Sequence, residues 1–252
     1  MRNPRIYQEQ TFSVGQTQPL SEDAFGHTVR VLRLKDGDAI ILFNGKIEND
    51  AEQPGYYEYQ AKLCNVAKKR ADIEIISKNL IDNESPLNIH LGQGISRGER
   101  MDFTLQKSVE LGVNTITPIF TERCGVKLTG ERLEKKREQW QKIVISACEQ
   151  SGRCTVPIVE QAIYLDDWLK QETNALKLNL HPKAQHSIMS LPIENQRVRL
   201  LIGPEGGLSD NEIVRANDAG FHDVLLGPRV LRTETAALTA ITVLQCRYGD
   251  LT

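Results

Sequence analysis

Two loops rich in glycine and proline contain the residues of this chain whose types and spacing suit ligand chemistry. The first reads GPEGG over 203–207, and the second reads GPRVLRTE over 227–234. Glycines let a ligand approach the backbone closely, while proline restricts a loop before anything binds. The second loop adds the guanidinium groups of Arg229 and Arg232. The first loop is neither a G-x-G-x-x-G motif nor followed by Gly-Lys-Ser/Thr, which argues against a nucleoside triphosphate site.

Each of these features also has a purely structural interpretation, and the residues alone leave both open. An ordinary strand–turn–helix corner explains the first loop, and a solvated surface charge explains Arg229 as well as a functional role does. Arg232 lies between an apolar strand end and Thr233, a predicted helix cap, and this position favours function. His181 ends another strand in LNLHP. A lone histidine is more often a packing residue, so its interest here is its position.

The segments around these loops predict an α/β domain. From Leu87 onward the predicted strands are LNIHLGQ, TITPIF, VPIVE, ALKLNLH, RVRLLIG and DVLLG, separated by helical or loop segments. One of these segments, residues 130–152, predicts a long amphipathic helix. Such alternation is typical of a mostly parallel sheet covered by helices on both faces. Ligands of such sheets bind beyond the carboxyl ends of the strands, where both loops and His181 are expected.

The first seventy-odd residues predict a small β-barrel. The runs AIILFNG and YYEYQAKLCNV are accompanied by the turn signals Asp36-Gly37 and Asn44-Gly45, and Ser21 is a good N-cap for a helix. The polar segment SKNLIDNESPLN has no periodicity and is the best linker candidate. We therefore predict a barrel domain over 1–75, a linker over 76–86 and the α/β domain over 87–252.

Composition narrows the class of protein. Hydrophobic residues make up 40% and charged residues 25% of the 252 positions, which is typical of a soluble globular protein. The net charge of −2 provides no global positive field, so any RNA-binding surface must be a local basic patch. No apolar run is long enough to span a membrane and no signal-peptide core is present, which favours the cytoplasm. Five cysteines without a C-x-x-C pair predict free thiols and no metal site.

The loops in their order carry a resemblance to a known family. LIGPEGGLS followed by LLGPRVLRTETAA closely resembles the ribosomal small-subunit RNA uridine N3-methyltransferases, a branch of the SPOUT (trefoil-knot) superfamily. The resemblance continues through HTVRVLR, LQKSVELGVNTITPIFTERCGVKL and ACEQSGRCTVP, and thus spans essentially the whole chain. One departure is Cys124-Gly125, where a serine is expected after Arg123.

The resemblance implies a fold, a reaction and a pocket. The barrel would be a PUA-like RNA-binding domain, and the α/β domain a trefoil-knotted methyltransferase domain. A homodimer would transfer a methyl group from S-adenosyl-L-methionine to N3 of a uridine in 16S ribosomal RNA of the small ribosomal subunit. Carried over residue by residue, the cofactor pocket would comprise Leu180, His181, Gly203, Pro204, Glu205, Gly206, Leu226, Gly227, Leu231, Arg232, Thr235 and Ala236.

This reaction needs particular groups. N3 of uridine is protonated and lies on the Watson–Crick edge, so the base must be unpaired or flipped out and must lose that proton. Glu205 is the candidate proton acceptor, although it could equally order the loop by accepting backbone hydrogen bonds. Arg232 is the candidate that stabilises the charge developing on the base. No metal is required, because the sulfonium already makes a good leaving group.

Phosphate contacts require basic residues that converge on one face, whereas scattered charges would be solvated surface. The candidates are Arg2, Arg5, Arg30, Arg33 and Lys35 in or near the barrel, and Arg123, Lys127 and Arg153 on sheet-edge loops. Two other functions remain open at this point. One is an α/β enzyme acting on a small nucleotide-like molecule, and the other is a non-catalytic RNA-binding ribosome-assembly factor.

Overall fold

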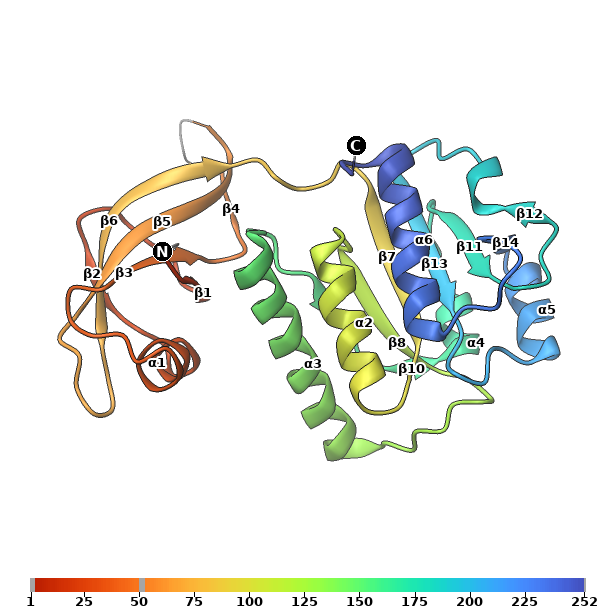
Figure 1. The fold of residues 1–252 in the computed structure, drawn as a ribbon, viewed down its shortest axis with the longest axis horizontal. Coiled ribbons are helices and arrows are strands. Elements are labelled where there is room, and N and C mark those ends of the chain that lie inside the picture. Colours follow the sequence, from red (N-terminus) through yellow and green to blue (C-terminus); the bar gives the residue numbers. More distant parts are fainter. Residues whose placement is uncertain (1–2, 50–52, 252) are drawn as a thin grey trace. The chain divides into compact units, whose positions relative to one another are not determined.

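The computed structural model describes residues 3–49 and 53–251 and divides into two units. The first unit comprises the chain up to Glu84 together with Cys148–Val156. The second comprises Ser85–Ala147 and the chain from Pro157 onward. Figure 1 shows a β-rich first unit and a second unit in which helices cover a sheet.

The first unit is built on a six-stranded sheet with the strand order β1-β3-β5-β6-β2 and β4 paired with β5. β1 runs parallel to β3, and the other neighbours are antiparallel. The strands are β1 (Arg5–Tyr7), β2 (Thr17–Pro19), β3 (Ala39–Phe43), β4 (Ile47–Glu48), β5 (Gly55–Cys64) and β6 (Asp72–Ile81). Helix α1 (Glu22–Phe25) is capped by Ser21, as predicted, and continues into a π-helical segment, Gly26–Val31.

The predicted linker over 76–86 is wrong at its start, because β6 continues to Ile81. The second half of β6 is mostly exposed, so it lacks the apolar alternation that identifies a strand in a sequence. Pairing with β5, which runs from Tyr56↔Ile81 to Cys64↔Asp72 with a register shift between Gln60 and Ala61, holds it by backbone hydrogen bonds instead.

The first unit also includes a distant segment that the predicted boundaries assign to the α/β domain. Residues 148–156 cover the end of helix α3 (Gly130–Ser151) and the turn that follows. Tyr7 N donates to Glu149 Oε1 at 3.0 Å, and Asn83 Nδ2 donates to Gly152 O at 2.9 Å. These long-range contacts leave no trace in local sequence pattern.

The second unit contains an eight-stranded sheet with the order β10-β8-β7-β13-β11-β14-β12 and β9 paired with β8. Every pairing in it is parallel. The strands are β7 (Asn88–Gly94), β8 (Thr115–Phe120), β9 (Ile158–Val159), β10 (Ile163–Tyr164), β11 (Leu176–Leu180), β12 (His186–Ser187), β13 (Arg197–Ile202) and β14 (His222–Leu225).

Helices cover both faces of this sheet, as predicted. Helices α2 (Glu99–Glu110), α3 and α6 (Thr233–Tyr248) lie over the near face in Figure 1, while α4 (Leu165–Leu169) and α5 (Asp210–Asp218) pack together elsewhere on the sheet. Because β13 is covered on both faces, all but its first residue are buried. No helix in the described ranges is both long and apolar enough to cross a membrane.

Candidate functional site

A cavity of about 570 Å³ lies at the carboxyl edge of the parallel sheet in the second unit. β11 pairs in parallel with both β13 and β14, so the loops that follow these three strands meet at one edge. The predicted pocket residues that line it are Leu180, His181, Gly203, Pro204, Glu205, Gly206, Leu226, Gly227, Leu231, Arg232 and Ala236. Thr235 is exposed and is not among the lining residues. The role of these residues as cofactor ligands stays a prediction.

The first Gly-Pro loop follows β13 and packs closely against β7. A Cβ atom on Gly94 would lie 2.5 Å from Pro204 N, so only glycine lets the loop take this path. At the other end of the loop, Ser209 and Glu212 form a capping box at the start of α5. The loop is therefore held between a strand and a helix start before any ligand binds.

Glu205 is engaged within the protein. Its Oε1 accepts hydrogen bonds from Arg97 N at 2.9 Å and from Arg100 Nη1 at 3.2 Å. Desolvation raises the pKa of Glu205, but backbone hydrogen bonds and the Arg100 guanidinium outweigh it, so the pKa lies below its ordinary value. A carboxylate stabilised in this way is a weaker base. The geometry thus favours the loop-ordering interpretation of Glu205 over the role of proton acceptor.

The second Gly-Pro loop follows β14 and leads into α6. The prediction that Thr233 caps this helix is wrong: α6 begins at Thr233, and its N-cap is Arg232, which makes no side-chain capping bond. Thr233 Oγ1 instead donates to Gly203 O at 2.6 Å and accepts from Gln93 Nε2 at 2.9 Å. The hydroxyl therefore connects the start of α6 to the first loop and to β7.

Arg232 is exposed at the cavity wall, as is Arg229. Within the described part of the chain, neither guanidinium forms an ion pair. Both are thus available to stabilise negative charge on a ligand.

Sequence reasoning missed further cavity residues, above all two acceptors. Asn179 and Glu234 both line the cavity. Asn179 Oδ1 and Glu234 Oε2 are buried, and neither has a hydrogen-bond partner among residues 3–49 and 53–251. An unpaired buried acceptor is costly, which points to a donor supplied by a ligand. Strand alternation could have identified Asn179, because a polar residue stands there in a buried strand.

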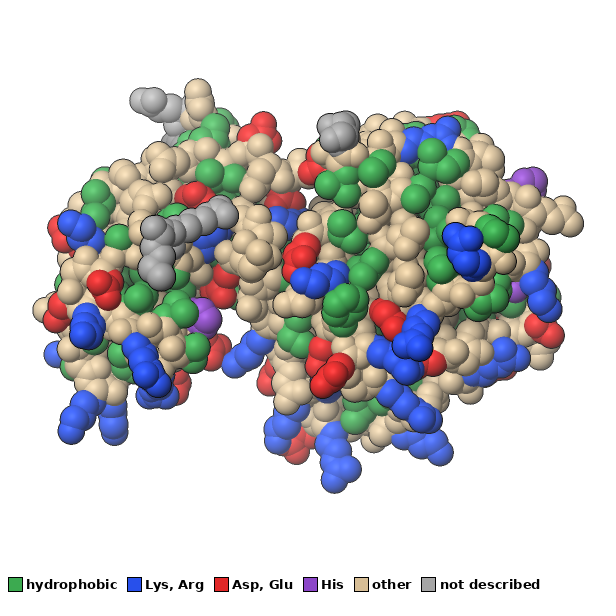
Figure 2. Space-filling model, viewed as in Figure 1, with side chains coloured by type: hydrophobic (Ala, Val, Ile, Leu, Met, Phe, Trp, Pro, Cys, Tyr) green, Lys and Arg blue, Asp and Glu red, His purple; other side chains and the backbone are tan. Residues whose placement is uncertain are grey.

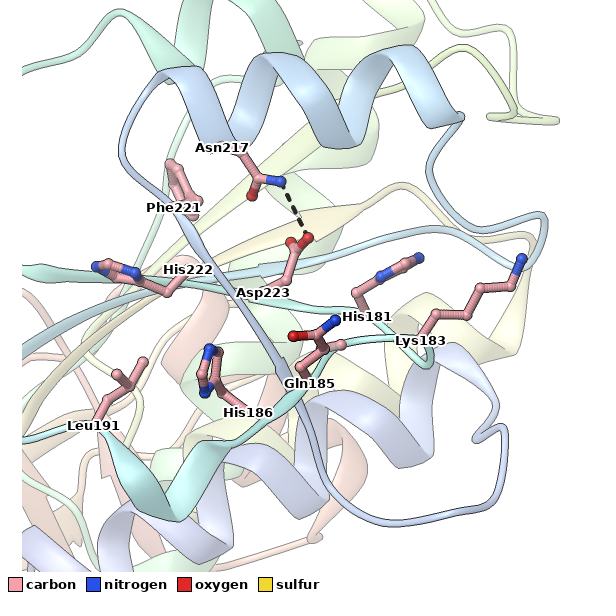
Figure 3. A pocket seen from close by; sticks show the side chains of 10 residues that line it. His181, Lys183, Gln185, His186, Leu191, Asn217, Phe221, His222 and Asp223 are labelled. Atoms are coloured by element: carbon pink, nitrogen blue, oxygen red, sulfur yellow. Dashed lines mark hydrogen bonds between the residues drawn. The ribbon is translucent and has the colours of Figure 1, made fainter.

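A second pocket of about 530 Å³ lies beside the end of β11 (Figure 3) and shares His181 and Lys183 with the first cavity. Asn217 at the end of α5 donates to Asp223 on β14 in its wall. Across the described ranges, no group of three or more His, Cys, Asp or Glu side chains is placed to hold a metal ion.

The structure contradicts the predicted RNA contacts of two residues, Arg5 and Arg153. Arg5 is 5% exposed and forms an ion pair with Glu58. It also donates to Arg153 O at 3.1 Å. Arg153 is likewise 5% exposed and pairs with Glu84 at 2.6 Å. Both guanidinium groups hold residues 148–156 against the barrel, so they are buried internal partners and cannot contact phosphates.

The other predicted contacts remain on the surface. Arg30, Arg33 and Lys35 are exposed in the first unit, and Arg123 and Lys127 are exposed in the second. Arg2 lies outside the described residues. Sequence reasoning missed three exposed cations on a neighbouring turn of the barrel, Lys68, Lys69 and Arg70.

This turn lies beside the loop that holds Lys35. Val66 N donates to Asp36 Oδ1 at 2.9 Å, and Gly37 N donates to Leu63 O at 2.8 Å. We call Arg30, Arg33, Lys35, Lys68, Lys69 and Arg70 the barrel basic loops. Figure 2 shows Lys and Arg side chains at the lower end of the first unit.

A barrel followed by a parallel-sheet domain with paired Gly-Pro loops at its carboxyl edge defines a SPOUT-like RNA methyltransferase. A family described as RNA methyltransferase domain matches residues 83–245, and one described as RNA methyltransferase PUA domain matches residues 20–47. The chain is 41% identical to the ribosomal RNA small subunit methyltransferase E of Buchnera aphidicola subsp. Schizaphis graminum, over 99% of this chain and 98% of that protein.

Two solved structures resemble the whole chain. The Neisseria gonorrhoeae ribosomal RNA small subunit methyltransferase E bound to S-adenosyl methionine is 43% identical, with a TM-score of 0.89 over 100% of both chains. A Legionella pneumophila methyltransferase in complex with SAM is 46% identical, with a TM-score of 0.93 over 100% of both. This chain therefore belongs to the ribosomal RNA small subunit methyltransferase E family. The threaded path of its C-terminal segment stays a prediction.

Proposed function

We propose that this protein methylates N3 of a uridine in 16S ribosomal RNA, with S-adenosyl-L-methionine as the methyl donor, in the cytoplasm. The observation that carries the proposal is the cavity at the carboxyl edge of β11, β13 and β14, which gathers both Gly-Pro loops and Arg232. Solved structures 43% and 46% identical to this chain are described with the same cofactor bound.

The residues of the cavity fit such a cofactor. Glycines at 203, 206 and 227 expose backbone groups to an adenine ring without loss of side-chain entropy. When bound, the cofactor would supply an electrophilic methyl group.

Among the residues of this chain, Arg232 stabilises the negative charge that develops on the uracil oxygens, since its guanidinium is exposed in the cavity without an ion partner. We assign acceptance of the N3 proton to Glu234 in place of Glu205. Glu205 is already engaged by Arg97 and Arg100, whereas Glu234 presents an oxygen without a partner in the described structure.

We further propose that the protein acts as a homodimer on the small ribosomal subunit. Exposed apolar side chains support a partner surface on the second unit: Phe103 on α2 is 46% exposed and Val230 in the second loop is 81% exposed. Figure 2 shows hydrophobic side chains over α2 and α6. Light scattering that gives the mass of one chain would contradict the dimer.

The proposal is tested by incubating the protein with methyl-labelled cofactor and unmodified small subunits, naked 16S RNA or free uridine. We expect label in assembled or nearly assembled ribosomal RNA, and label in free uridine would refute this substrate. The non-catalytic alternative predicts no heat of cofactor binding in calorimetry. The cavity and the unpaired Arg232 favour the enzyme.

A further inference from the structure

Asn179 is a buried side chain in the cavity whose function the reaction above leaves unassigned. It lies on β11, is 0% exposed and lines the cavity. No donor in residues 3–49 or 53–251 reaches its Oδ1. Buried amide oxygens in folded proteins are almost always paired, so an unpaired one in a cavity wall indicates a missing donor.

The orientation of this amide is determined by its neighbours. Asn179 and Asp223 are directly opposite each other in the parallel pairing of β11 with β14. Asn179 Nδ2 donates to Asp223 Oδ1 at 2.7 Å. Asp223 Oδ2 accepts from Asn217 Nδ2 at 3.1 Å, and Figure 3 shows this second bond. An ionised carboxylate can only accept, so the NH₂ group of Asn179 must face Asp223. The oxygen is thereby held away from Asp223.

The kind of donor follows from charge. A neutral amide oxygen suits a neutral N–H or O–H group, whereas the cationic ammonium of the cofactor is better matched by a carboxylate. The cavity has such a carboxylate in Asp210, at the start of α5. Asn179 is therefore matched to the adenosine half of the cofactor.

We propose that Asn179 Oδ1 accepts a hydrogen bond from the adenosine half of the cofactor, and that Asp223 is a positioning residue that keeps this acceptor facing the cavity. This inference rests on the proposed function, because it names a specificity contact within the same site. Asp223 does not touch the cofactor and acts only by selecting one of the two amide orientations of Asn179.

Calorimetry with S-adenosylhomocysteine tests the contact in the full-length protein. Asn179→Ala should raise the Kd about tenfold to a hundredfold, because a buried donor of the ligand loses its partner. Asp223→Asn should raise it similarly although residue 179 is unchanged. An asparagine at 223 can donate to Asn179 Oδ1, which lets the amide flip and turn its NH₂ toward the ligand.

Two further variants separate this mechanism from a general structural role. Asn217→Ala removes the outer hydrogen bond but keeps Asp223 against Asn179, so the Kd should change less than threefold. The exchange Asn179→Asp with Asp223→Asn again pairs the two side chains and leaves a carboxylate oxygen toward the cavity, so it should recover most of the affinity lost in Asp223→Asn. At saturating cofactor, kcat should be preserved in Asn217→Ala. Circular dichroism and Tm without ligand check that each variant folds.

Ligand analogues on the wild type identify the donor. 5′-Methylthioadenosine, which lacks the amino-acid half, should show the same relative loss with Asn179→Ala. If the adenine amino group is the donor, S-inosylhomocysteine, in which a carbonyl replaces it, should bind the wild type and Asn179→Ala equally. If a ribose hydroxyl is the donor, the loss persists with that analogue.

Wild-type affinity in Asn179→Ala or in Asp223→Asn would overturn the inference, with a bound water then satisfying Oδ1. A wild-type protein that binds no S-adenosylhomocysteine would overturn the proposed function itself.

Discussion

At the scale of single residues, some polar groups of the site already have partners within the protein, and others are available to a ligand. Glu205 and Thr233 look from the sequence like a catalytic base and a helix cap, but both serve to hold loops together. Arg232 and Glu234 are charged cavity residues whose polar atoms remain open to a ligand. Their different surroundings lead to two predictions.

Arg232→Ala should lower kcat by about a hundred- to a thousandfold while cofactor affinity changes less, because the guanidinium stabilises charge that develops only in the transition state. Single-turnover methylation of small subunits and calorimetry measure the two effects. Arg229→Ala is the matched control, since Arg229 lines the same cavity and is equally exposed. Unchanged turnover in Arg232→Ala would remove this residue from the mechanism.

Glu234→Gln should lower kcat about a hundredfold, whereas Glu205→Gln should retain most of the turnover and lose stability. The pKa of Glu205 is lowered in the folded protein, so its contribution to stability is present at neutral pH and is lost as pH falls through the folded pKa. The difference in unfolding free energy between wild type and Glu205→Gln should therefore shrink below about pH 4. A loss of turnover in Glu205→Gln but not in Glu234→Gln would instead assign acceptance of the N3 proton to Glu205.

At the scale of elements, parallel pairing brings the loops of the site together and places a half-buried histidine, His90, within the sheet. His90 on β7 lies 2.8 Å from Thr117 Oγ1 on β8, and its ring meets Trp168 edge-on at 5.6 Å. Burial, with a smaller effect from Arg199, lowers the pKa of His90 to about 4. The folded sheet therefore holds this ring neutral at pH values where the unfolded chain protonates it.

The unfolded state takes up this proton near pH 6.5 and the folded state only near pH 4, so stability should fall as pH drops through this window, by roughly 3 kcal/mol in total. His90→Gln should show a shallower decrease in urea unfolding between pH 7 and pH 4.5. His222→Gln, at an exposed histidine on β14, is the control and should follow the wild type. Parallel curves of stability against pH for all three proteins would contradict the claim that the folded protein holds His90 neutral.

At the scale of the whole molecule, the acidic net charge of −2 requires RNA contact through local clusters. The barrel basic loops provide one such cluster, with Lys68, Lys69 and Arg70 on the turn before β6. Burial of Arg5 and Arg153 shows why clusters cannot be assigned from residue type alone.

Replacing Lys68, Lys69 and Arg70 together by alanine should weaken binding to 16S RNA and reduce the slope of log K against log salt by up to about 2 to 3. Cofactor affinity should remain unchanged, because the cavity lies in the other unit. Fluorescence anisotropy over a salt series measures the slope. Replacing Arg132, Lys135 and Lys142 on α3 together by alanine controls for the loss of three positive charges as such. An equal decrease in this slope in both variants would mean that the turn with Lys68, Lys69 and Arg70 has no specific role in RNA binding.

The sequence by itself determined the elements, the order of the motifs and the family, because loop chemistry and strand or helix periodicity are local properties of the chain. It therefore identified both Gly-Pro loops, Arg232 and eleven of the residues that line the cavity. Only the tertiary structure decided which polar groups are already paired. Glu205 is engaged by residues from α2 and the segment before it, Arg5 by partners more than fifty positions away, and Asn179 by a neighbouring strand. Such contacts depend on chain segments brought together by folding, and local sequence pattern does not encode them.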